Sequence, residues 1–288
     1  MATDPTKIIV PEPPNLPLGT EQYERRYQDQ FTNVLRLYFN RLTNALAALF
    51  GSSGGALLRF PYGAFHQDGV TTLTAALTNT STTPIAVVST ADFASSGALL
   101  IGDELILYTG KTPTTFTGIT RGAYTSTNVA HSIGAAVSES LGVASAATAR
   151  SIPFTNTDAS NQVTLNTINT AHVDFAVSGY YNIQFSAQLY NNTTTEDRVT
   201  FWFKKNGADV PNSAGVVTIQ KSTGSGTGAV IISWNIVLDV TAGQYIELYF
   251  ASDTGNTVVT TYPAGTAPVH PVSPSVILTA TFVSALYA

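Results

Sequence analysis

Short runs of alternating apolar and polar residues fill the C-terminal half of the chain. From Tyr181 to Leu189 every second residue is apolar, and the residues between them are polar. A period of two residues is typical of strands that bury one face. About ten such runs, separated by Asn, Gly, Asp and Thr turns, predict an antiparallel sandwich or jelly roll over 151–288. The clearest of the other runs are 199–203, 230–240, 246–250 and 276–282.

Residues 20–55 carry the one strong helical pattern, which ends at a group of glycines. Apolar side chains recur every three or four residues in two neighbouring rows, so the apolar face of the helix is wide. Such a face can pack on the protein's own β-domain, or it can form a parallel bundle of three helices around one axis. We expect the bundle, a trimeric coiled coil. Its core would consist of Phe31, Leu35, Tyr38, Phe39, Leu42, Leu46 and Leu49.

The remaining segments differ in composition. Residues 1–19 hold five prolines and five Ile, Val or Leu residues, a mixture that forms no core of its own. This segment is either a disordered tail or an attachment arm that orders on a partner, and its apolar residues favour the arm. Residues 56–69 form an apolar connector, residues 70–140 a small β-module, and residues 141–150 an Ala/Ser-rich linker to the head at 151–288. The predicted fold class is therefore mainly β.

Charged residues are scarce and cysteine is absent. Only 11% of the residues are charged, whereas roughly 25% is usual for soluble proteins. The net charge of −5 argues against nucleic-acid binding. The most apolar stretch, 34–50, contains Arg36 and Arg41, so we expect no membrane insertion. A Thr-rich protein without cysteine fits one that folds in a reducing cytosol and later works outside the cell.

The β-module contains a set of short motifs: Phe93–Gly97, Ile101–Glu104, Tyr108–Gly110, Thr120–Gly122 and His131 with Gly134–Ala135. Through these motifs it resembles a module of tailed-phage virion proteins. The N-terminal segment 20–46 likewise resembles the opening of phage structural proteins, including those of phages that infect cyanobacteria. Both resemblances imply a place in a virion and carry no implication about catalysis.

The C-terminal segment contains four short motifs at the starts and turns of its predicted strands: Gly179–Tyr181, Phe203–Gly207, Thr241–Tyr245 and Pro274–Leu278. Through these motifs it resembles C1q/TNF-like jelly-roll heads. The resemblance implies a homotrimer in which each protomer meets its neighbours through one sheet. The Gly-X-Y repeat that precedes such heads in animals is absent, and a helix and a virion-type module stand in its place.

No residue pattern indicates catalysis. Glu196 and Asp197 are adjacent, so in an extended chain they point to opposite sides and make a poor glycosidase pair, and Asp103–Glu104 fits a hairpin turn. The four histidines lack metal-ligand spacing. We therefore predict no catalytic residue, no metal site and no cofactor. Of the eight acids in 151–288, strands should point Asp174, Asp239 and Glu247 outward, and turns should hold Asp158, Glu196, Asp197, Asp209 and Asp253.

Four aromatic residues fall outside the predicted core: Tyr180, Tyr190, Trp202 and Tyr262. Aromatic side chains dominate protein interfaces, so in a trimeric head we expect them first at subunit contacts. Their rings also stack on sugars, so contact with a glycan is the alternative.

These features predict a non-enzymatic, homotrimeric virion structural protein of a tailed phage, made in the host cytoplasm and located in the virion. A short tail fibre with a receptor-binding or spacer head fits best. A trimeric capsid-decoration or head-fibre protein is the alternative, and a polysaccharide-cleaving enzyme is a distant one. The expected partners are other copies of the chain, tail or capsid proteins that bind the N-terminal arm and helix, and a host surface glycan or protein.

Overall fold

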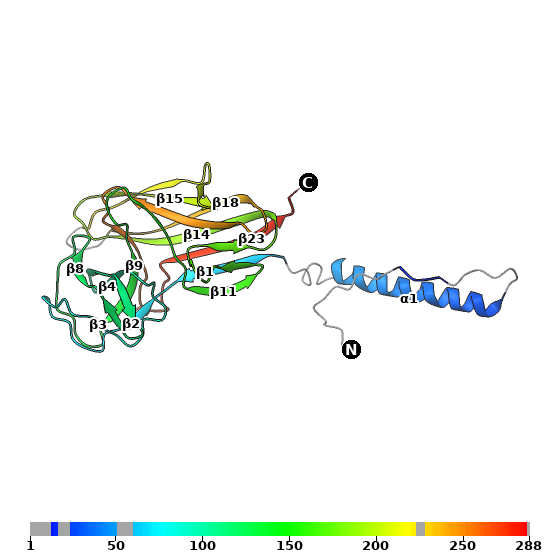
Figure 1. Ribbon diagram of the computed structural model, residues 1–288, viewed down its shortest axis with the longest axis horizontal. Coiled ribbons are helices and arrows are strands. Elements are labelled where there is room, and N and C mark those ends of the chain that lie inside the picture. The colour runs from blue at the N-terminus through cyan, green and yellow to red at the C-terminus, as the bar shows by residue number, and fades with distance from the viewer. Residues whose placement is uncertain (1–12, 17–23, 51–59, 223–227, 287–288) are drawn as a thin grey trace. The chain divides into compact units, whose positions relative to one another are not determined.

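The computed structural model describes residues 13–16, 24–50, 60–222 and 228–286. The chain divides into two compact units, Met1–Phe60 and Pro61–Ala288. Strands make up most of the second unit, and the described residues contain a single α-helix (Figure 1). The mainly β fold predicted from the alternation is therefore confirmed. Most of the predicted arm, and the predicted start and end of the helix, lie outside the described residues.

The first unit contains helix α1, Arg25–Phe50. None of its described side chains is buried, and Phe39 and Leu46 expose 55% and 44% of their surface. Leu49 belongs to the helix, but its side chain lies outside the described residues. The apolar stripe predicted for this helix is thus largely open within one chain. Four other predicted core residues are half-buried: Phe31, Leu35, Tyr38 and Leu42.

The second unit contains two antiparallel head sheets (Figure 1). The two sheets enclose one apolar core. The first head sheet runs β11 (Asn156–Asn161), β1 (Tyr62–Gln67), β23 (Val276–Ser284), β14 (Gly179–Asn191), β18 (Gly228–Val240). The second runs β12 (Val163–Leu165), β13 (Val173–Phe175), β19 (Tyr245–Ser252), β15 (Asp197–Lys205), β16 (Ala208–Asp209). Two further strands of the second sheet are β17 (Gly215–Ile219), on β15, and β10 (Ala149–Ser151), on β19.

The core lies where the alternation places it. Tyr181, Ile183 and Phe185 of β14 point inward from the first head sheet and are buried, with polar residues between them facing out. From the second sheet, Phe201 lies with its ring centroid 5.5 Å from that of Phe185, and Phe250 lies 5.8 Å from Phe201. Burying such side chains supplies most of the free energy that holds two sheets together.

The order of segments predicted along the chain needs correction. The connector at 56–69 supplies β1, which lies between β11 and β23, and Phe65 of this strand is fully buried in the head core. The predicted linker at 141–150 is not a linker either: Leu141 and Val143 are buried in the same core. The head therefore begins with β1, and the small β-module is an insertion after that first strand.

The inserted module has a core of its own. Strands β2, β9, β4, β5 and β8 continue the first head sheet through pairing of β9 with β20, while β3, β7 and β6 form a separate small sheet. Leu99, Ile106 and Phe116 are among the residues buried between them. The module strands are β2 (Val70–Thr72), β3 (Ile85–Ala86), β4 (Gly97–Ile101), β5 (Glu104–Tyr108), β6 (Gly110–Thr112), β7 (Thr115–Thr117), β8 (Thr120–Ala123) and β9 (Ala136–Leu141).

A third apolar cluster joins the module to the head. Tyr190 and Val258 of the head pack with Leu100, Leu105 and Ala123 of the module. The shared sheet and this cluster explain why both parts belong to one compact unit. The remaining strands of the unit are β20 (Thr257–Thr260), β21 (Gly265–Thr266) and β22 (Val269–His270). Among the described residues, no helix is both long and apolar enough to cross a membrane.

Candidate functional site

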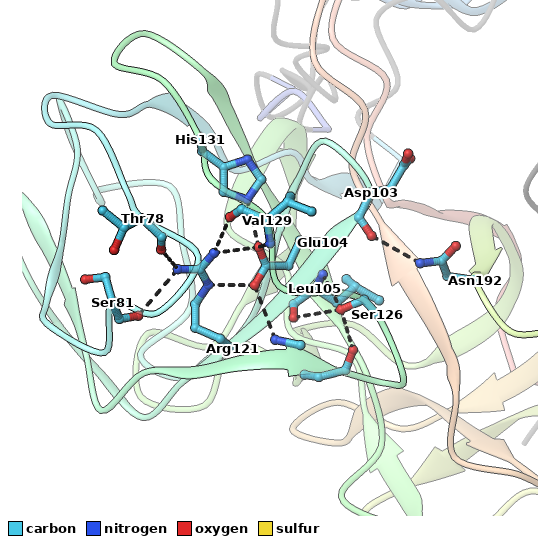
Figure 2. A network of polar contacts seen from close by, with 12 residues as sticks. Thr78, Ser81, Asp103, Glu104, Leu105, Arg121, Ser126, Val129, His131 and Asn192 are labelled. Carbon is cyan, nitrogen blue, oxygen red and sulfur yellow. Dashed lines mark hydrogen bonds and ion pairs between the residues drawn. The ribbon is translucent and has the colours of Figure 1, made fainter.

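A buried ion-pair network lies in the module (Figure 2). Glu104 begins β5 and is fully buried, and Arg121 of β8 donates from Nε and Nη2 to its two carboxylate oxygens at 2.6 and 2.7 Å. The backbone N–H groups of Gly122 and Val129 donate to the same carboxylate at 3.3 and 3.1 Å. His131 Nε2 lies 2.8 Å from Glu104 Oε2. Protein groups therefore enclose the carboxylate completely.

The network connects distant segments of the module. Burial by itself raises the pKa of Glu104, but the hydrogen bonds from Arg121, Val129 and His131 outweigh it, so the pKa lies below its usual value. Arg121 also donates to the carbonyl oxygens of Thr78 and Val129 at 2.7 and 2.6 Å. A sealed carboxylate cannot reach a substrate, so the network serves stability.

The hairpin turn predicted at Asp103–Glu104 is half right. Asp103 lies in the turn and is exposed, whereas Glu104 starts the next strand and is buried. Arg121 and His131 are both among the motif residues named for the module. Their contacts with Glu104 were not predicted, because both residues lie far from Glu104 in sequence. An acidic residue directly before the apolar run 105–108, with an arginine further along, was the available signal.

A second buried carboxyl group, Glu139 of β9, lies beside β1. Its Oε1 accepts a hydrogen bond from the backbone N–H of Ala94 at 2.7 Å, and its Oε2 is buried without a hydrogen bond. Burial raises the pKa of Glu139 to about 7, against smaller opposing effects of the Ala94 N–H, Gln67, Lys111 and Arg150. This carboxyl group therefore titrates near neutral pH inside the fold.

Glu247 points to the outer side of β19, as predicted, but it is not open to solvent. Only 5% of its surface is exposed. His172 Nε2 lies 3.4 Å from its carboxylate. Of the other acids placed on strands, Asp239 is exposed and Asp174 is half-buried.

The prediction of a solvated turn at Asp197 is wrong. This residue starts β15, and its carboxylate accepts hydrogen bonds from the hydroxyls of Ser252 and Thr257 at 2.5 Å and from the backbone N–H of Thr254 at 3.0 Å. Burial opposes ionisation, but these bonds prevail and lower the pKa of Asp197. The carboxylate thus fixes the loop after β19. The other acids predicted in turns are all exposed, but two of them lie in strands: Asp158 in β11 and Asp209 in β16. Glu196 and Asp253 lie outside strands.

The four aromatic residues predicted outside the core occupy different environments. Tyr180 is 38% exposed, and Trp202 is half-buried on the outer side of β15. Tyr190 is only 2% exposed, so its predicted contact role is wrong: it joins the module to the head. Tyr262 is half-buried against the same cluster, and burial raises its pKa to about 12. Within the described residues, no three His, Asp or Glu side chains come together in a way that could hold a metal ion.

Apolar side chains are exposed along one edge of the head. Among the described residues β18 pairs only with β14, so its other edge is free. Val230 and Trp234 lie on the inner side of β18, yet they expose 36% and 45% of their surface, and Val216 of β17 exposes 53%. Between β17 and β18 a groove of about 250 Å³ reaches the core rings of Phe185 and Phe201. We call this set the apolar edge: Val216, Val217, Val230, Ile232 and Trp234.

The outer side of the first head sheet carries no charge over its central rows. Asn182, Gln184 and Ser186 of β14 alternate with the core residues and face outward. Ile231 and Val237 of the neighbouring β18 are 67% and 56% exposed. We call this surface the uncharged face. Its members are Asn182, Gln184, Ser186, Gln188, Ile231, Ser233, Asn235, Val237, Ile277, Thr279, Thr281 and Val283.

The comparisons with known proteins bring no further assignment, since no family model and no curated protein matches this chain.

Proposed function

We propose that the chain is a non-enzymatic, homotrimeric structural protein of a phage virion and that it serves as a short tail fibre. The observation that carries the proposal is the presence of an apolar edge and an uncharged face on one head. A long free edge strand with exposed apolar side chains is a liability for a monomer, because it invites association. A second copy that covers the edge buries these apolar side chains, and the contact stabilises the assembly.

The two surfaces differ, so a contact between them is heterologous. The apolar edge of one copy would pack on the uncharged face of the next, and a closing rotation turns such contacts into a ring. Neither surface requires a charged group to leave water, which keeps the desolvation cost low. The number three rests on the resemblance to C1q/TNF-like heads. The open apolar stripe of α1 supports it, because a wide stripe favours bundles of more than two helices.

The path of the chain supports a jelly-roll head. From β13 to β19 the chain crosses repeatedly between the sheets: β13 lies in the second, β14 in the first, β15 and β17 in the second, β18 in the first and β19 in the second. Connections of this kind are typical of Greek-key and jelly-roll sandwiches. Virion proteins use such heads as compact building blocks.

The buried acids support a structural role. A glycosidase needs two carboxyl groups that face one sugar from opposite sides. Glu104 and Asp197 are enclosed by hydrogen bonds, and Glu139 is sealed at the junction with β1. We assign the attachment to the particle to residues 1–19 and α1. A capsid-decoration protein would attach through the same parts, so images of virions carrying labelled protein decide between tail and capsid.

Sedimentation of the full-length protein tests the assembly. We expect a species of three times 30.4 kDa at micromolar concentration. Replacing Ile231 by Lys places a charge in the contact, because 67% of this side chain is exposed in a single chain and the ring would bury it. The variant should dissociate at concentrations at least roughly 100-fold higher than the parent.

The matched control is Ile133→Lys. Ile133 has the same 67% exposure but lies in the module, so this variant should sediment as the parent does. A stable monomer of the parent protein, or equal behaviour of the two lysine variants, would contradict the proposed assembly.

A further inference from the structure

We propose that the outer side of the second head sheet binds a neutral oligosaccharide on an aromatic platform formed by Trp202, Tyr249 and Tyr245. The proposal rests on the proposed function, in which a projecting head meets the host surface. The platform and the uncharged face lie on opposite sides of the sandwich, because they belong to the outer sides of different sheets. The apolar edge lies on β17 and β18 and the uncharged face on the first sheet, so the assembly uses neither β15 nor β19, the strands that carry the platform.

Two rings form the first part of the platform. Trp202 of β15 and Tyr249 of β19 lie directly opposite each other in the register, with ring centroids 5.7 Å apart and a tilt of 32°. Trp202 Nε1 donates to Asp209 Oδ1 at 2.8 Å, which fixes the orientation of the indole. Trp202 and Tyr249 are both half-buried, so part of each ring meets solvent. Flat, partly exposed rings are the groups on which the apolar faces of pyranose sugars stack.

A second aromatic pair lies further along β19. Tyr245 and His172 stack with ring centroids 3.7 Å apart and an angle of 9° between the planes. Tyr245 precedes Tyr249 by four residues on one side of the strand, which corresponds to about 13 Å at the usual rise. This distance is close to the length of two or three linked pyranose rings, so one short oligosaccharide could lie over both pairs.

The polar groups between the two pairs favour a neutral ligand. Lys204 Nζ lies 4.5 Å from the centroid of the Tyr249 ring and 3.5 Å from Asp209 Oδ1. Glu247 pairs with Lys204 in the register and has His172 at 3.4 Å. Asp174, the register partner of Tyr245, lies on the same side and accepts a hydrogen bond from Asn166 at 2.9 Å. Glu247 is only 5% exposed, so Lys204, Asp209 and Asp174 are the more accessible charged groups beside the rings. Paired donors and acceptors suit hydroxyl groups, which donate and accept equally well, better than a phosphate or a charged peptide.

The platform also differs from the apolar edge in composition. The apolar edge consists of Val, Ile and Trp side chains, which suit a protein surface, whereas the platform combines aromatic rings with Lys204, Asp209 and Glu247. The two tryptophans of the chain are divided between these surfaces: Trp202 belongs to the platform and Trp234 to the edge. Each tryptophan can therefore report on one surface.

The full-length protein labelled with 5-fluorotryptophan tests the proposal by ¹⁹F NMR. The probes are maltotetraose, cellotetraose, laminaritetraose and tetra-N-acetylchitotetraose, each titrated to about 10 mM, tenfold above the Kd of about 1 mM expected for a shallow site. We expect at least one probe to shift the Trp202 resonance with saturation and to leave the Trp234 resonance in place. Tyr249→Ala should weaken binding at least tenfold. Tyr62→Ala, an exposed tyrosine of β1, should leave it unchanged.

The outcomes separate the two proposals. If the protein sediments as a trimer and no probe moves the Trp202 resonance, the platform is not a saccharide site and the proposed assembly stands. If a probe shifts both resonances equally, or binds Tyr249→Ala as well as the parent, the assignment to this platform is overturned. A monomer that still binds a probe through Trp202 would overturn the assembly and support the platform.

Discussion

Replacing Arg121 by Met is expected to lower the free energy of unfolding by about 3–5 kcal/mol. The variant leaves the carboxylate of Glu104 fully buried while removing the two shortest of its hydrogen bonds, at 2.6 and 2.7 Å. It also leaves the carbonyl oxygens of Thr78 and Val129 without their guanidinium donor. Urea unfolding at pH 7, followed by circular dichroism in the parent and the variant, measures the loss.

Two further variants isolate the origin of that loss. Arg198→Met removes an exposed arginine of β15 and should leave the unfolding midpoint unchanged. The double variant Glu104→Gln with Arg121→Met should lose less than the sum of the single variants, because no unpaired charge then remains buried. An Arg121→Met variant that loses less than about 1 kcal/mol would show that the network contributes little to stability.

The alternation along the chain predicts the strands that carry the head core. β14, β15, β18, β19 and β23 all cover runs of period two, because one side of each strand faces the inside of the sandwich and the other side faces out. Helix α1 is likewise marked by its spacing of three and four residues. These patterns are local, so they can be recognised without knowledge of the neighbours of each strand.

The position of β1 could not be predicted in this way. Its neighbours β11 and β23 lie far away in sequence, and pairing between distant strands leaves no periodic mark on a six-residue segment. For the same reason, the sequence does not predict that the module is inserted after β1. The Ala/Ser content of 141–150 suggested a linker, but small residues also fit where Arg150 reaches back to donate to the carbonyl oxygen of Gly142 at 2.6 Å.

The environment of single acids depends on tertiary contacts even more strongly. Asp197 and Glu196 are neighbours, yet the first is buried and the second is exposed. Asp197 accepts hydrogen bonds from the hydroxyl groups of Ser252 and Thr257, which flank the loop after β19. Trp202 was recognised from its place on a polar side of a strand. Tyr245 and Tyr249 follow the same rule on β19 and could have been found with it.

Replacing Glu139 by Gln is expected to remove a large pH dependence of stability. In the folded protein the pKa of Glu139 is about 7, whereas the usual pKa of a glutamate is 4.5, so the difference is about 2.5. Each tenfold change in proton affinity corresponds to about 1.4 kcal/mol, so the whole effect is about 3 kcal/mol. Between pH 4.5 and pH 7 the folded parent protein keeps a proton that the unfolded chain has released. Its free energy of unfolding therefore falls as the pH rises through this window.

The difference between parent and variant isolates this effect, because Glu104 and Asp197, whose pKa values are lowered, act in both proteins and with the opposite sign. The glutamine keeps the acceptor for the Ala94 N–H and carries no charge. The free energy of unfolding of the variant, relative to that of the parent, should therefore rise by about 3 kcal/mol between pH 4.5 and pH 7.5. Glu196→Gln, at an exposed carboxylate, serves as the control and should follow the parent curve. Parallel curves for parent and Glu139→Gln would mean that Lys111 and Arg150 already hold this carboxylate ionised, since these cations favour the charged form.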